Sequence, residues 1–158
     1  MNLPAWQQEL DRVLQSWAHP PTPWMAGQQL KGVGVDCVRF VIGVMDELHG
    51  VDLPPVPRLP QDMSLHDRAG AMRVARAMES RYPHVVVADG RLEPGDVLVR
   101  KIGAGGGPGH VMIMGVRPNE IWHATSGVGV VRGSMVFPGD SLLHVWRPTE
   151  REHWGEKR

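Results

Sequence analysis

The first residues of the chain carry a helical repeat of apolar side chains. Between residues 3 and 17 these side chains recur at steps of three and four, at Leu3, Trp6, Leu10, Val13, Leu14 and Trp17. This spacing predicts an amphipathic helix, and Asn2 and Pro4 suit a helix start. The prolines within residues 19–23 end it.

A second helix is predicted over residues 38–48, where apolar side chains lie on nearly every side, so that it should be buried. His49-Gly50 marks its end. Residues 51–60 are too rich in proline for a helix or an inner strand and predict a surface connection. Ser64 and Asp67 resemble a capping box for a third amphipathic helix. The arginines outside the apolar face of this helix should face solvent; they are Arg68, Arg73 and Arg76.

After Tyr82 the pattern changes to short runs of β-forming residues, at residues 85–87, 97–100, 110–116, 121–124, 128–131 and 142–146. Helices therefore come first and strands second, and no repeat is visible. This segregation favours an α+β fold with a largely antiparallel sheet, because alternating units would interleave the two. We expect one domain over residues 1–158, with an N-terminal helix within residues 1–20 and a tail from about residue 148.

Composition narrows the function classes. Lys plus Arg and Asp plus Glu number 17 each, so nothing indicates binding to nucleic acid or to an anionic membrane. The single cysteine excludes an intramolecular disulfide. The N-terminal residues resemble neither a signal peptide nor a membrane anchor.

That single cysteine stands at the predicted start of the second helix, behind the glycine-containing segment 27–34, which we expect to be flexible. Asp36 is a good N-cap residue, and the first turn of a helix favours a negative charge. A thiolate at Cys37 should therefore be stabilised. The alternative is that Cys37 is a small buried hydrophobe, as free cysteines often are.

Two of the eight histidines are candidate partners for the thiol. His110 opens a predicted strand directly after a glycine-rich loop, and His123 lies in the next strand. His110 would act as base and His123 would hold its tautomer. With a tight turn around residues 117–120, the two lie about four residues out of register, or roughly 13 Å, which a bulge or strong shear must close.

Other sites are less well supported. The loop at residues 103–109 lacks the Lys and Ser/Thr of a phosphate-binding loop. Cys37, His110 and His123 offer sulfur and imidazole for zinc, but no CxxC or HExxH spacing accompanies them. Pro94-Gly95-Asp96 reads as a turn into a strand, without a catalytic role.

Together these residues resemble the NlpC family of papain-like cysteine peptidases that cut cell-wall peptides. The matching motifs occur in the family's order: Asp36-Cys37, Pro94-Gly95-Asp96, His-Val-x-Ile-x-Gly at residues 110–115, and His123-Ala124. The stretch LKGVGVDC at residues 30–37, with the proline-rich connection after the helix, is similar to the branch found among tail genes of phages and gene transfer agents.

The resemblance implies a papain-like fold with Cys37 as nucleophile, His110 as base and His123 as the orienting residue, and it requires no metal or cofactor. It also implies hydrolysis of peptidoglycan stem peptides, at the bond between D-glutamate and the diamino acid. Candidate substrate-binding residues are Trp24, Asp36 and Arg39. The family's usual tyrosine near Trp24 is replaced in this chain, and Val38-Arg39 stands where the family usually has Ser-Gly.

Without an export signal, delivery within a virion tail after synthesis in the host cytoplasm would bring the enzyme to the wall. Its partners would then be tail-tip or hub proteins. The alternative function is a structural tail-tip component that keeps the peptidase fold with little or no turnover.

Overall fold

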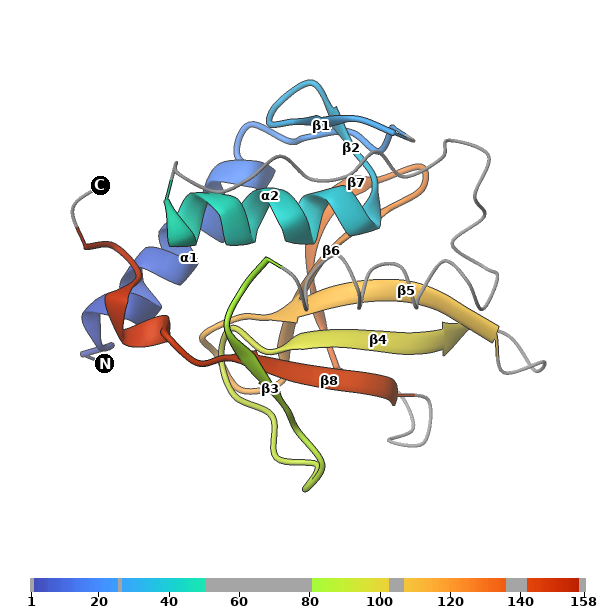
Figure 1. Ribbon diagram of the computed structural model, residues 1–158. Coiled ribbons are helices and arrows are strands. Elements are labelled where there is room, and N and C mark those ends of the chain that lie inside the picture. The colour runs from blue at the N-terminus through green and yellow to red at the C-terminus, as the bar shows by residue number, and fades with distance from the viewer. Residues whose placement is uncertain (1, 26, 51–80, 103–106, 136–141, 157–158) are drawn as a thin grey trace.

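The computed structural model describes residues 2–25, 27–50, 81–102, 107–135 and 142–156. The predicted connection at residues 51–60 and the predicted third helix with its arginines lie outside the described residues. Figure 1 shows two helices, α1 and α2, on one side of a curved sheet. The helices are α1 (Ala5–Ala18) and α2 (Cys37–His49). The strands are β1 (Gln29–Leu30), β2 (Gly34–Val35), β3 (His84–Val86), β4 (Val97–Ile102), β5 (Gly107–Met114), β6 (Glu120–Thr125), β7 (Gly129–Ser134) and β8 (Leu142–Pro148).

The strands after Tyr82 form one antiparallel sheet in the order β3-β8-β4-β5-β6-β7. Within the described residues, the main sheet follows both helices as predicted, and only the short strands β1 and β2 lie between α1 and α2. The predicted α+β class is confirmed. The hairpins β4–β5, β5–β6 and β6–β7 join neighbours in the chain. Strand β8 returns between β3 and β4, so the C-terminal part of the chain lies inside the sheet.

Alternating side chains bury both faces of the sheet. From β4 and β5, Val97, Val99, Val111 and Ile113 join the core shared with α1 and α2. Leu98, Met112 and Met114 form a second cluster with Ile121 and Val145 on the opposite face. A period of two along each strand produces this division.

Helix α2 is buried nearly all round, as its sequence predicts. Phe40, Val41, Ile42, Val44 and Met45 are each 0% exposed. The helix packs between α1 and the strands β5 and β6. It ends at Gly50, whose φ of 104° is readily adopted by a residue without a Cβ.

Two segments differ from the sequence-based expectation. Part of the expected flexible segment 27–34 belongs to a small antiparallel hairpin, in which β1 pairs with β2. The expected tail after residue 148 folds back onto the molecule: Arg151–His153 form a 3-10 turn and Trp154 is only 2% exposed. The Trp154 ring lies edge-on against Trp6, with 6.0 Å between centroids, so burial of this large ring outweighs the polar residues around it.

Candidate active site

Asp36 caps α2 as predicted. Its Oδ1 accepts a hydrogen bond from the Arg39 backbone N–H at 2.8 Å. Its Oδ2 accepts from the Gly27 backbone N–H at 2.9 Å, which ties the preceding loop to the helix. Both carboxylate oxygens therefore hold backbone groups of this chain, and they fix the turn that carries Cys37.

Cys37 lies in the first helical turn, but its environment differs from the prediction. The residue is only 3% exposed. Burial raises the pKa of its thiol to about 12, and the nearby negative charge of Asp36 acts in the same direction. Backbone N–H groups, first that of Val111, pull the pKa down but do not offset burial. Burial therefore favours the neutral thiol, contrary to the expectation of a stabilised thiolate.

The two candidate histidines meet directly. His110 Nε2 and His123 Nδ1 are 2.7 Å apart, and the ring centroids are separated by 4.9 Å in an edge-on arrangement. The strands pair Ile113 with Trp122. If this pairing is continued to His110, the position directly opposite His110 lies two residues from His123, and not four residues as expected. The expected gap of roughly 13 Å was too large, since diagonal neighbours on paired strands are about 7–8 Å apart at the backbone.

The environment of His123 favours its neutral form. Burial lowers the His123 pKa, and the positive charge of Arg100 lowers it further. With His123 neutral, one arrangement of this bond has Nε2–H of His110 as donor and Nδ1 of His123 as acceptor. This assignment leaves the Nδ1 lone pair of His110 to take a proton, which is the form that a general base requires.

The nucleophile candidate and this histidine pair belong to adjoining elements. Helix α2 packs against β5 and β6. The Val111 backbone N–H acts on the Cys37 sulfur, and Val111 directly follows His110 in β5. The fold therefore places the first turn of α2 next to the strand that carries His110. Acyl transfer by a cysteine needs a base beside the thiol. The catalytic roles themselves remain predictions.

The remaining predicted site residues flank this region. Trp24 forms a parallel bridge with Val35, two residues before Cys37, and packs partly buried against the core. Arg39 Nε lies 3.8 Å from Asp36 Oδ2, and its side chain is 16% exposed. Its charge is thus balanced within the protein. Substrate binding by Trp24, Asp36 and Arg39 remains a prediction.

The turn aspartate, Asp96, has a structural role, in keeping with its sequence. It is 0% exposed and accepts two hydrogen bonds from Arg147, each of 2.9 Å. It also accepts the Glu93 backbone N–H at 2.8 Å. Charge-assisted bonds of this kind satisfy a carboxylate that would otherwise be costly to bury.

Sequence reasoning missed Arg100 as a member of the site. Arg100 pairs with His110 across β4 and β5, beside a shift of register, and its charge acts on His123. The alternation of apolar residues predicts both strands. It does not predict which residues face each other, since a bulge changes the pairing.

The described residues contain no cluster of three or more His, Cys, Asp or Glu side chains suited to a metal ion. The zinc alternative for Cys37, His110 and His123 therefore gains no geometric support. In the same part of the chain, no helix has the length and apolar character needed to cross a bilayer.

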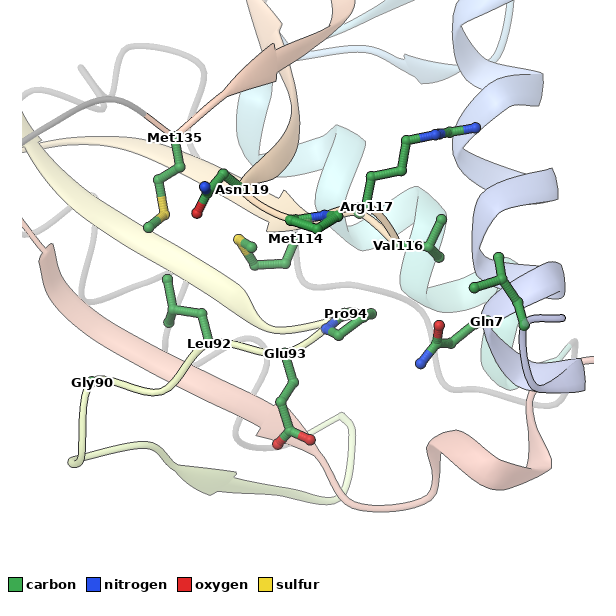
Figure 2. Close-up of a pocket in the computed structure, with 13 residues that line it drawn as sticks. Gln7, Gly90, Leu92, Glu93, Pro94, Met114, Val116, Arg117, Asn119 and Met135 are labelled. Carbon is green, nitrogen blue, oxygen red and sulfur yellow. The ribbon is translucent and has the colours of Figure 1, made fainter. Parts of the chain in front are cut away.

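A separate pocket of about 520 Å³ lies between the start of α1 and the turn from β5 to β6. Figure 2 shows Leu92, Pro94 and Met114 around this hollow, with Glu93 and Arg117 at its margin. Glu93 pairs with Arg147 and Arg117 pairs with Glu120, so these charges are balanced within the protein. The residues that line this pocket do not include Cys37, His110 or His123.

Comparison with known proteins gives a fold match without a sequence match. The chain matches no family model and no curated protein. A Staphylococcus aureus protein, described as similar to lipoprotein and of the NLP/P60 family, aligns with a TM-score of 0.54 and 17% identity over 89% of this chain. The match spans 41% of that protein. The NlpC/p60 domain of the peptidoglycan hydrolase SagA aligns with a TM-score of 0.50 and 20% identity, over 85% of this chain and 96% of the domain.

These likenesses confirm the predicted fold: two helices packed on a mostly antiparallel sheet, as in NlpC/P60 domains. With identities of 20% and below, the likeness concerns the fold and not the activity.

Proposed function

We propose that this protein is a cysteine endopeptidase that hydrolyses an amide bond in the stem peptides of peptidoglycan. The observation that carries the proposal is the hydrogen-bonded pair of His110 and His123, at 2.7 Å, beside a helix that begins with Cys37. The shared fold with the NlpC/p60 domain of a peptidoglycan hydrolase supports the substrate class.

The proposed reaction begins from a neutral thiol and a neutral imidazole, because burial raises the Cys37 pKa. As the sulfur attacks the amide carbonyl carbon, its proton passes to Nδ1 of His110. The tetrahedral intermediate then collapses: the carbon–nitrogen bond breaks, and His110 gives its proton to the leaving amine. A thioester remains on Cys37.

Water completes the cycle. The oxygen of the water molecule attacks the thioester carbon while His110 takes a proton from the water. The carbon–sulfur bond then breaks and releases the carboxylic acid. The proton returns to the sulfur. His123 stays neutral throughout and orients the ring of His110 through the bond between them.

The finer proposal is that the bond cleaved joins D-glutamate to the diamino acid, and that the enzyme is carried in the tail of a phage or a phage-like particle. The motif LKGVGVDC at residues 30–37 supports the tail context by its similarity to that branch of the family. The partners would be tail-tip or hub proteins.

A second candidate is a structural tail-tip component with the same fold and little turnover. The 3% exposure of Cys37 favours it, because a substrate carbonyl must reach the sulfur before any bond can form. The two candidates make opposite predictions for the loss of the thiol.

Digestion of purified peptidoglycan, with wild-type protein and with Cys37→Ala, tests the proposal. We expect the wild type to release peptides with a new amino terminus inside the stem peptide, without free sugars, and the variant to release none. Mass spectrometry identifies the bond. Equal products from both proteins would refute the role of Cys37.

The tail context needs particles assembled with either protein. Equal assembly with impaired wall penetration by Cys37→Ala supports a tail-borne peptidase. Equal assembly and equal penetration would favour the structural component.

A further inference from the structure

The hairpin β1–β2 leads directly into the candidate nucleophile. Strand β2 ends at Val35, and only Asp36 separates it from Cys37 at the start of α2. Val35 also carries the bridge to Trp24. The position of this hairpin therefore affects both the first turn of α2 and the placement of Trp24.

The hairpin is too short to hold its own position. Each strand contributes two residues, and even longer two-stranded hairpins are marginally stable in water. At its turn, the Gly32 backbone N–H donates to Oγ1 of the buried Thr22 at 2.8 Å. Contacts with residues outside the hairpin must therefore hold it in position.

Lys31, in the same turn, is such an anchor. Its Nζ lies 2.7 Å from Glu47 Oε1 in α2 and donates to Ser16 Oγ in α1 at 2.6 Å. The ammonium group also lies 5.4 Å from the centroid of the Trp17 ring. One side chain thus binds the hairpin to both helices.

The acceptor side of this anchor is itself oriented. Trp17 Nε1–H donates to Glu47 Oε1 at 2.9 Å, which holds the carboxylate toward α1. The Lys31 and Glu47 side chains are each 33% exposed, so the charges are only partly screened by water. The Trp17 ring in turn fills the space at Gly43, where a Cβ would lie 2.5 Å from it.

Lys31 acts at a distance from the thiol. Glu47 follows Cys37 by ten residues in α2, which corresponds to about 15 Å along the helix axis. Any effect of Lys31 on catalysis must therefore pass through the placement of the hairpin and the helix start.

We propose that Lys31 is a positioning residue: through Ser16 and Glu47 it holds the β1–β2 hairpin so that Asp36 and Cys37 lie in the geometry required for hydrolysis. This inference rests on the proposed peptidase function. It assigns a physical role to the lysine of the LKGVGVDC motif.

The test compares Lys31→Met, which keeps an unbranched apolar stem, with Lys31→Arg, which keeps the charge. We expect Lys31→Met to lower kcat on peptidoglycan peptides about tenfold with little change in KM, since small displacements of reacting groups are costly. Lys31→Arg should recover most of the loss. Kinetics are measured at a temperature where thermal melts show every variant to be folded.

Two further variants separate positioning from general stability. Asp11→Asn removes another ion pair of α1, with Arg117, and should leave kcat unchanged. Glu47→Gln keeps an acceptor for Trp17 but removes the charge, and should reproduce part of the defect of Lys31→Met. The double variant should be no worse than Lys31→Met alone, because Lys31→Met already removes the interaction with Glu47. A wild-type kcat in Lys31→Met, or an equal loss in Asp11→Asn, would overturn the proposal.

Hydrogen exchange distinguishes failure of this inference from failure of the proposed function. If the wild type shows no turnover, the peptidase proposal fails, yet faster amide exchange over residues 27–36 in Lys31→Met would still support the anchor. Unchanged exchange there would refute it, whatever the activity.

Discussion

The two ends of α2 are held by different kinds of contact. At the C-terminal end, Arg81 binds Asp46 through two bonds of 2.8 and 2.9 Å, and the Tyr82 hydroxyl group donates to the same carboxylate. At the N-terminal end, Cys37 lies among apolar side chains, and the Asp36 carboxylate accepts hydrogen bonds from backbone N–H groups.

The C-terminal end of α2 is anchored by buried charges, whereas its N-terminal end carries the candidate nucleophile. The side chain of Arg81 is 8% exposed, so its charge requires the partner, and burial raises the Tyr82 pKa so that the hydroxyl group remains a donor. The thiol end carries a longer ion pair, in which Arg39 Nε lies 3.8 Å from Asp36 Oδ2. Its other polar groups are backbone N–H groups and the two histidines of the sheet.

The largest expected effect concerns the histidines at the thiol end. His110→Ala should lower kcat by about 10³-fold or more, because it removes the base. His123→Ala should cost less, since it removes only the partner that orients His110. Steady-state kinetics on peptidoglycan peptides measure both. If His123→Ala has no effect, the bond of 2.7 Å between the rings has no catalytic role.

The next effect concerns the reactivity of Cys37. With a pKa of about 12, the native thiol should react with iodoacetamide about a thousandfold more slowly at neutral pH than a thiol of pKa 9.0. Between pH 10 and pH 11 the rate should still rise about tenfold, whereas a thiol of pKa 9.0 has nearly reached its plateau there. Mass spectrometry after timed labelling gives the profile, with urea-unfolded protein as the control. Rapid labelling below pH 8 would mean that the helix start does stabilise the thiolate.

The smallest effect, on stability, concerns the opposite end. Asp46→Ala leaves Arg81 without its carboxylate and should lower the free energy of unfolding by roughly 2–4 kcal/mol. Because the thiol end is untouched, kcat of the folded protein should stay unchanged. Urea denaturation and kinetics below the transition test both. Arg12→Ala, at a side chain 61% exposed, is the matched control and should have little effect on stability. A reduced kcat in folded Asp46→Ala would show that the two ends are not independent.

Local patterns predicted the elements because they depend on neighbouring residues. The apolar repeat identified α1 and α2 to within a few residues, and the short β-forming runs identified the six strands of the main sheet. Asp36 was recognised as the cap because a side-chain oxygen before a helix accepts its free N–H groups. By contrast, β1 and β2 were missed, since strands of two residues carry too little pattern to detect.

Contacts between distant segments were harder to infer. Trp154 was expected in a tail, because nothing in its neighbourhood predicts that its ring would dock beside Trp6, far away in the chain. The separation of His110 and His123 was overestimated, because a register depends on the turn and on the packing of both faces.

The sequence by itself determined which residue types are available at the site: one cysteine at a capped helix start and two histidines at neighbouring strands, in an order that resembles the NlpC peptidases. Tertiary structure decided what state they are in. The Cys37 pKa is raised because packing removes water from the thiol, and the histidines meet because the sheet pairs β5 with β6 in one register. Desolvation and register are properties of the assembled core, so no local stretch of residues encodes them.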